Sequence, residues 1–455
     1  MRLRYVSVVA ALAMAAAACG QSSGDGGGDT IELTITQNAI AGGKNAAGAN
    51  FIQNWVIPQF EAAQKAKGKD VKVKFIPSGV DDEQYKTKLS LDLKSGKGAD
   101  VMDIDGIWLG EFAEAGFLKP LPAQSDSWEG WSQIPEAVQG LATFNGKKYA
   151  LPVGTDGRVL YFNKTLMAKA NLPADWQPKS WQEVLDAGAK LKAAGVPVPI
   201  QINAGTAMGE ATSMQGLLPL LAGAGGEVQK DGKWTGASQP LKDALGLYQK
   251  IYGGSGLGDP KLQQEAKGRD KSFQQFAEGK IGILMEGDYF WRGVVNPATG
   301  VAKMADRDQV VGYAMIPAIE PGKGVRGQDF VSMSGGSLRT LNPNSKHPAE
   351  AFELLALTLS ADGLKAETKD GNVRITPRTD VNKEILAGDP LLTYISDNVL
   401  KLTAYRPPVA LYPQVSTALQ EATAEVVGGK TPDEAATAYQ QKLEGIAGGA
   451  GNIAS

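Results

Sequence analysis

The order of strand-like and helix-like patterns near the start of the chain constrains the fold most. Short apolar or alternating stretches, typical of strands, occur at 31–36, 71–76 and 101–104. Between them, residues 51–67 and 81–93 repeat apolar side chains at helical spacing. Such a β-α-β-α-β order is typical of a parallel sheet with helices on both faces. We therefore predict an α/β fold.

One later stretch looks like the wall of a ligand cleft. The apolar run Ile281–Met285 has the length of a buried strand, and Gly287 ends it. Asp288, Tyr289 and Trp291 follow at once. In open α/β sheets, ligands bind beyond the carboxyl ends of the strands. A strand end capped by core aromatics is the alternative that this stretch alone leaves open.

Composition limits the possible functions. The chain has 455 residues, of which 43% are hydrophobic, enough for two domains with cores of their own. The formal net charge is −3 and no long basic run occurs, so we expect no nucleic-acid partner. One cysteine and one histidine are too few for an ordinary zinc site. We expect no metal, no cofactor and no catalytic residue.

The N-terminus has the pattern of an export signal. Arg2 and Arg4 precede an apolar run at 5–14, and small residues lead to Cys19. The segment Ala16–Cys19 resembles a bacterial lipoprotein box, which implies removal of residues 1–18 and a lipid on Cys19. A lipidated, glycine-rich tether at 19–30 would then hold the protein at the outer face of the cytoplasmic membrane. An ordinary cleaved signal with a chance cysteine is the alternative.

Six separated segments together resemble one family. They are GADVMDIDGIWLGEFAEAGFLKPL (98–121), KKYALPVGTDGRVLYFNKTL (147–166), PKSWQEVLDAGAKLKAAG (178–195), FAEGKIGILMEGDYFW (276–291), NSKHPAEAFELLALTLS (344–360) and VVGGKTPDEAATAYQQKL (426–443). In this order they resemble the extracellular sugar-binding proteins of ABC importers, of the maltose-binding type.

That resemblance implies a two-lobed, type II periplasmic-binding-protein fold. Each lobe would be a mostly parallel sheet flanked by helices, with a hinge between the lobes. We expect lobe one at 31–152 plus 318–375 and lobe two at 153–317 plus 376–455. Caps at Ser180 and Thr431 are predicted to begin two helices of the second lobe. The tail from Gly448 to Ser455 is expected to be disordered.

The resemblance also implies which side chains meet the ligand. Sugar hydroxyls need carboxylates and amides, and the C–H face of a sugar suits an aromatic ring. Tyr289 matches the position of a stacking aromatic, with Trp291 next on the same side. Asp156 and Arg158 would form a charged clamp at a lobe crossing. The other expected ligand-binding residues are Asn38, Lys44, Asp105, Trp108, Glu210, Asp329 and Tyr412.

The function implied is capture of a carbohydrate, such as an oligosaccharide, and its delivery to an ABC-type membrane permease by lobe closure. The protein would act as a monomer. A binding protein for another solute, such as a peptide or a glycerophosphodiester, is an alternative, because Lys44 and Arg158 leave room for it. A secreted glycoside hydrolase is a further alternative. Its two carboxylates could come from Asp105, Asp156, Glu210 and Asp288.

Overall fold

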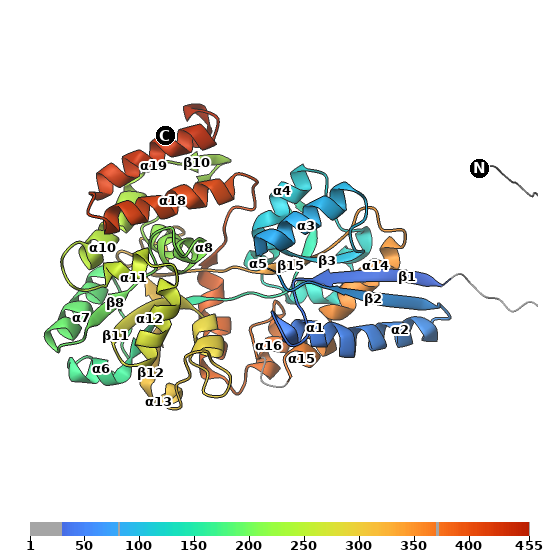
Figure 1. Ribbon diagram of the computed structural model, residues 1–455, viewed down its shortest axis with the longest axis horizontal. Helices are drawn as coiled ribbons and strands as arrows, with labels where there is room; N and C mark the ends of the chain where they lie inside the picture. The colour runs from blue at the N-terminus through green and yellow to red at the C-terminus, as the bar shows by residue number, and fades with distance from the viewer. Residues whose placement is uncertain (1–29, 81, 370–372, 455) are drawn as a thin grey trace, which may run out of the picture.

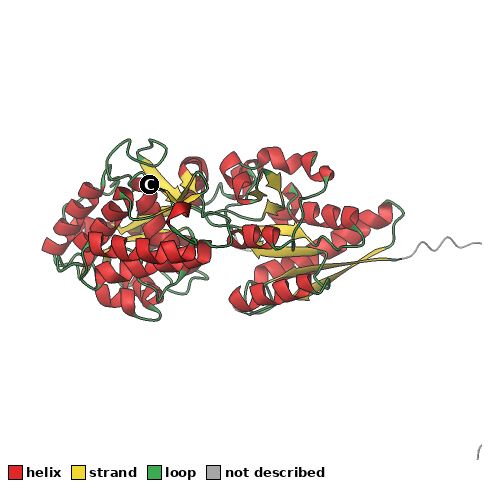
Figure 2. Ribbon diagram, turned by 90° about the horizontal axis from the view of Figure 1, so that it is seen from above, coloured by secondary structure: helices red, strands yellow, loops and turns green. Residues whose placement is uncertain are grey.

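The chain forms two α/β lobes joined by three crossing segments (Figure 1). A computed structural model describes residues 30–80, 82–369 and 373–454. The predicted leader, Cys19 and the tether as far as Asp29 lie outside the described residues. Figure 2 shows helices on both faces of the strands in each lobe. The α/β class predicted from the alternation of elements is confirmed.

The first lobe is built on a five-stranded sheet in the order β2-β1-β3-β15-β6. Its strands are β2 (Val71–Pro77), β1 (Ile31–Gln37), β3 (Val101–Asp105), β15 (Ser337–Leu341) and β6 (Ala150–Pro152). The helices around it are α1 (Ala46–Phe51), α2 (Ile57–Ala66), α3 (Asp82–Lys94), α4 (Leu109–Glu114), α5 (Glu136–Leu141), α14 (Pro348–Thr358) and α15 (Ala361–Glu367). Leu33, Ile35 and Val101 are fully buried between these layers.

The second lobe is built on a four-stranded sheet in the order β12-β7-β11-β8. Its strands are β12 (Val311–Ala314), β7 (Arg158–Asn163), β11 (Ile281–Gly287) and β8 (Val198–Gln201). The main helices are α7 (Trp181–Ala193), α9 (Leu218–Gly223), α10 (Gln239–Tyr252), α12 (Gly268–Ala277), α18 (Tyr412–Val427) and α19 (Pro432–Ile446). Every residue of β11 is buried. Ser180 and Thr431 cap α7 and α19 as predicted, each accepting a backbone N–H.

In each sheet one strand runs against the others. β15 is antiparallel to both β3 and β6, and β7 is antiparallel to both β11 and β12. Each of these two strands begins directly after a crossing segment, so the chain enters the sheet from the hinge side. The remaining strands of each sheet point the same way. Their carboxyl ends therefore face the other lobe.

Two segments pack on the lobe opposite to the one expected from the sequence. Residues 318–333 lie against α9: the amide of Ile319 donates to the carbonyl of Gly223 over 2.9 Å, and that of Val325 to Ala222 over 2.8 Å. The helix α16 (Thr379–Ile385) instead lies beside α15 in the first lobe (Figure 1). Its Val381 is buried in the first-lobe core. The second and third crossings therefore follow Met333 and Ile385.

The C-terminal tail is ordered, contrary to expectation. The short strand β17 (Ile453–Ala454) pairs in parallel with β10 (Lys233–Thr235), and Ile453 stands opposite Trp234. Ile453 joins the buried second-lobe core. The glycine-rich sequence before it suggested disorder, but one apolar side chain with a strand edge to pair with is enough to fix the tail.

Candidate functional site

A cavity of about 400 Å³ lies between the lobes where the crossings meet; we call it the central cavity. A cavity of this size is within the range of small-molecule sites. Its side-chain lining includes Asp105, Thr155, Asp156, Arg158, Glu210, Met214, Gln215, Arg269, Arg292, Ser337, Arg374, Ile375 and Arg406. Two adjoining hollows of about 290 and 370 Å³ share Ser337 with it and extend along the first lobe. The combined volume is larger than a single sugar ring requires.

Asp156 and Arg158 form an ion pair on the first crossing, which we call the clamp. An Arg158 Nη1–H donates to Asp156, while Nε donates to Gln215 over 3.0 Å. The amide of Gly335, on the second crossing, donates to Asp156 over 2.7 Å. Burial alone would raise the pKa of Asp156, but the Arg158 charge and the Gly335 hydrogen bond outweigh it and lower the pKa. The clamp therefore joins two crossings through an ionised carboxylate.

Glu210 and Asp105 are joined across the cavity by Arg406. Arg406 donates to Glu210 of the second lobe and to Asp105 of the first, each over 3.3 Å. Burial of Arg406 would lower its pKa, but Asp105, Tyr412 and Glu210 together raise it. Glu210 also accepts from Tyr412 over 2.7 Å and from Ser416 over 2.6 Å.

Tyr412 is fully buried and is not part of the cavity lining. Its hydroxyl donates to the carboxylate of Glu210, so Tyr412 lies behind Glu210 as seen from the cavity. The prediction of Tyr412 as a direct ligand contact therefore does not match this structure. Tyr412 is the first residue of α18, and the sequence around it did not indicate in which direction its ring would point.

Asn38, Lys44 and Trp108 line the 290 Å³ hollow, which we call the first-lobe hollow. The Asn38 amide and the Lys44 ammonium both donate to the carbonyl of Val80, over 3.1 and 2.8 Å. Trp108 is buried between Tyr85 and Phe112, with ring centroids 6.4 and 6.2 Å away. It is thus both a wall of the hollow and a packing anchor for its helix.

Tyr289 and Trp291 point in opposite directions. Tyr289 is 43% exposed, with the Arg292 guanidinium 5.7 Å from its ring centroid. Trp291 is 3% exposed, and its Nε1–H donates to both carboxylate oxygens of Asp389 over 3.0 and 3.2 Å. The expectation that both face the same side is wrong. The chain is helical here, with φ −55° and ψ −35° at Tyr289, so residues two apart lie on opposite faces.

Asp329 does not reach the central cavity. It is exposed, and its carboxylate accepts the amide of Gly322 over 2.8 Å, closing the turn that precedes β14 (Phe330–Met333). The family resemblance placed it near the cleft, yet the residues after it, Gly335 and Gly336, are the ones that line the cavity. Its role here is to hold a turn.

Three arginines of the cavity were not anticipated. Arg269 makes two hydrogen bonds to Glu286, over 2.7 and 2.8 Å, and Arg374 donates to Glu367 over 2.7 Å. Arg292 forms a looser ion pair with Asp288, with 3.6 Å between Nε and Oδ2. A usable signal was present: Glu286 and Asp288 flank the end of a buried strand, and buried carboxylates need cationic partners. The sequence did not reveal which arginines would supply them.

Asp288 is buried beneath the cavity. Burial raises its pKa to about 6, with nearby Asp156 adding to the increase and Arg292 and Arg158 opposing it. Neither of its carboxylate oxygens accepts a hydrogen bond from the described residues.

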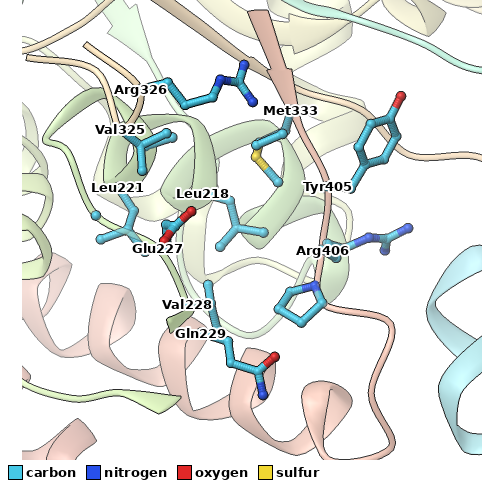
Figure 3. A pocket seen from close by; sticks show the side chains of 14 residues that line it. Leu218, Leu221, Glu227, Val228, Gln229, Val325, Arg326, Met333, Tyr405 and Arg406 are labelled. Atoms are coloured by element: carbon cyan, nitrogen blue, oxygen red, sulfur yellow. The ribbon is translucent and has the colours of Figure 1, made fainter. Parts of the chain in front are cut away.

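A smaller, more apolar cavity of about 120 Å³ lies behind Arg406 in the second lobe (Figure 3). Leu218, Leu221 and Val228 line it, and the Arg406 guanidinium points away from them. The same backbone segment thus has an apolar side toward the lobe core and a charged side toward the central cavity.

Within the described ranges, no group of three or more histidine, cysteine, aspartate or glutamate residues could hold a metal ion. None of the described helices combines the length and apolar character needed to cross a membrane.

Comparison with solved structures gives the same architecture. An ABC transporter solute-binding protein from Thermotoga lettingae, bound with α-D-tagatose, is 26% identical, with a TM-score of 0.69 and coverage of 91% of this chain and 99% of that one. Maltose-bound MalE3 of T. maritima, 22% identical, has a TM-score of 0.70 over 91% of this chain and 100% of its own. The type II, maltose-binding-protein-like fold is confirmed.

Sequence relatives show a similar degree of identity. A binding protein of Brucella abortus (strain 2308) is 27% identical over 278 residues, covering 60% of this chain and 62% of that protein, less than two thirds of its length. The diacetylchitobiose binding protein DasA of Streptomyces coelicolor is 27% identical over 374 residues, 77% of this chain and 76% of DasA. Residues 45–365, more than half of the chain, match the family described as bacterial extracellular solute-binding protein. The chain belongs to this family.

Proposed function

We propose that the protein binds a carbohydrate outside the cytoplasm and delivers it to an ABC-type permease by closing its two lobes. The observation that carries the proposal is the central cavity, where hydrogen-bonding side chains of both lobes and two crossings converge. A ligand that contacts both lobes shifts the equilibrium toward the closed form by the difference between its binding free energies for the closed and open forms. The tagatose bound to the Thermotoga protein and the diacetylchitobiose of DasA's name support a carbohydrate.

The packing of the elements supports the following division into lobes. We assign residues 31–153, 337–369 and 373–385 to lobe one, and residues 158–333 and 389–454 to lobe two. The short segments between them would act as the hinge, which absorbs backbone change over a few residues. A lipid on Cys19 and a monomeric state remain part of the proposal. Mass spectrometry of the membrane fraction and light scattering test them.

Among the candidate ligand contacts, Asp105, Asp156, Arg158 and Glu210 line the central cavity. Asn38, Lys44 and Trp108 would meet a longer ligand in the first-lobe hollow. Tyr289 would stack at the rim of the cleft. We do not propose Trp291, Asp329 and Tyr412 as ligand contacts, because their side chains bind other residues of the protein.

Hydrolysis fits the cavity less well than binding. A glycosidase needs a carboxylic acid that stays protonated near neutral pH beside the substrate. The pKa of Asp156 is lowered, and Asp288, whose pKa is raised to about 6, is buried and absent from the cavity lining. Incubation with oligosaccharides followed by chromatography tests this, and turnover would contradict the binding function.

The decisive experiment is a thermal-shift screen of the purified protein. Malto-, cello-, xylo-, galacto- and chito-oligosaccharides would be compared with peptides and glycerophosphodiesters. At 100-fold excess over Kd, a ligand stabilises by about 2.7 kcal/mol. We expect a shift with at least one carbohydrate. A shift with a non-sugar solute and with none of the carbohydrates would reject the proposal.

A further inference from the structure

We propose that the cleft selects carbohydrates that carry an anionic substituent, and that Arg292 receives it. This inference rests on the proposed carbohydrate-binding function and narrows the class of ligand. The chemistry required is a carboxylate or ester oxyanion on the sugar. A uronate carboxylate and a phosphate ester both supply it.

The central cavity has an unusual lining for a neutral sugar. Five arginines and three carboxylates line it: Arg158, Arg269, Arg292, Arg374, Arg406, Asp105, Asp156 and Glu210. No aromatic side chain is among the described residues of that lining. A neutral sugar ring gains from stacking on an aromatic face, and here the one exposed candidate, Tyr289, lies beside the cavity next to Arg292. Guanidinium groups are suited to paired hydrogen bonds with planar or tetrahedral oxyanions.

Four of the five arginines are engaged by the protein itself. Arg158, Arg269 and Arg374 each donate at least two hydrogen bonds to neighbouring groups at 3.1 Å or less. Arg406 is divided between Glu210 and Asp105. These side chains form the frame of the site, since several of their N–H groups already have acceptors within the protein.

Arg292 differs from the others. Its side chain is 32% exposed, and the ion pair with Asp288 spans 3.6 Å. Its Nε–H donates no hydrogen bond to any described residue, and neither oxygen of Asp288 accepts one. Because this Nε–H is buried, a ligand would meet the terminal N–H groups and the positive charge of the guanidinium, while Asp288 keeps the side chain in the cleft.

Arg292 also occupies a junction. It lines both the central cavity and the adjoining hollow of about 370 Å³, which also includes Gly154, Ser337 and Arg374. An anionic group placed where the two spaces meet would lie between a second-lobe arginine and a first-lobe arginine. Binding there would draw the lobes together, which links recognition of the charge to closure.

Calorimetry with matched sugars tests the inference. The pairs are glucuronate with glucose and digalacturonate with galactobiose, and glucose 6-phosphate separates the phosphate from the carboxylate. The acidic member should bind about tenfold or more tightly, because a hydrogen bond to a charged group adds that much. Its advantage should shrink as salt is raised from about 0.01 to 1 M. Equal or tighter binding of the neutral members would overturn the inference while leaving the proposed function intact.

Variants locate the effect. Arg292→Gln should remove the preference for the acidic member, and Arg292→Lys should retain part of it, because the charge remains without the paired donors. Arg307→Gln is the matched control: its guanidinium stacks on Trp291, 3.7 Å from the ring centroid, and is not among the residues lining the cleft. Melting curves check that each variant folds. A preference that survives Arg292→Gln would overturn the assignment, and binding of no carbohydrate at all would overturn the proposed function as well.

Discussion

Two aromatic residues two positions apart should give opposite results when each is replaced by alanine. Trp291→Ala removes a buried ring that contacts Tyr313 and Arg307 and leaves Asp389 without its Nε1–H donor. Truncation of a buried tryptophan costs about 3–5 kcal/mol. Tyr289→Ala removes a side chain that is 43% exposed, and such changes alter stability by about 0.5 kcal/mol or less.

The magnitudes translate into melting temperatures. A cooperative unit of 150–250 residues shifts by about 2–4 °C per kcal/mol, so Trp291→Ala should lower the Tm of the second lobe by about 10 °C. Tyr289→Ala should change it by about 2 °C at most. For ligand affinity the order reverses, since loss of aromatic stacking of about 0.5–1.5 kcal/mol weakens binding by about 2- to 12-fold.

Differential scanning calorimetry and isothermal titration with the sugar found in the screen measure both quantities. Trp291→Phe is the matched control, because it keeps an aromatic ring at the site while it loses the Nε1–H donor and part of the buried volume. It should fall between wild type and Trp291→Ala in stability. An unchanged Tm together with lost binding in Trp291→Ala would refute the orientation of these rings.

Three further predictions concern stability. Because the pKa of Asp288 is raised to about 6, its negative charge lowers the stability of the folded protein above pH 6. This loss of stability disappears as the pH falls toward 3.8, the ordinary pKa of an aspartate. Asp288→Asn should therefore be more stable than wild type by about 2–3 kcal/mol at pH 8 and equal to it near pH 4, as measured by urea unfolding at both pH values. Glu210→Ala removes the acceptor of Tyr412, Ser416 and Arg406 and should cost about 2–4 kcal/mol; an unchanged urea midpoint would argue against that network. Truncation after Gly449 removes β17 and the buried Ile453 and should cost about 1–3 kcal/mol, which thermal melting followed by tryptophan fluorescence would detect.

The element order followed from the sequence because it depends on local periodicity, whereas the two-lobed architecture was implied by the family resemblance. Apolar runs such as β11 and caps such as Ser180 act within a few residues, and their signals are strong. The clamp of Asp156 and Arg158 was also accessible, since the two lie on one short segment. These are features for which sequence neighbours are also spatial neighbours.

The rest depended on orientation and on distant pairing. The family resemblance put Tyr289 and Trp291 on one side, whereas the helical turn there separates them. Arg374 reaches the cavity only because its segment packs near the first crossing, where it donates to the carbonyl of Val153. Arg269 looks like any surface residue of a helix until the buried Glu286 that it neutralises is located. These orientations and contacts depend on how distant segments pack in the folded lobes, so no short stretch of the sequence predicts them.

The two described chain ends lie on different lobes of the molecule (Figure 1). β1 enters the first lobe at the end away from the crossings, and the C-terminal segment is held by β10 on the second lobe (Figure 1). A stretching force applied to the two ends would be shared by the three crossing segments, which connect the lobes in parallel, and it would oppose closure. Tension would therefore act as a competitor of the ligand. In an optical trap, the force at which the lobes separate would rise with the logarithm of ligand concentration, so the protein could serve as a molecular force gauge.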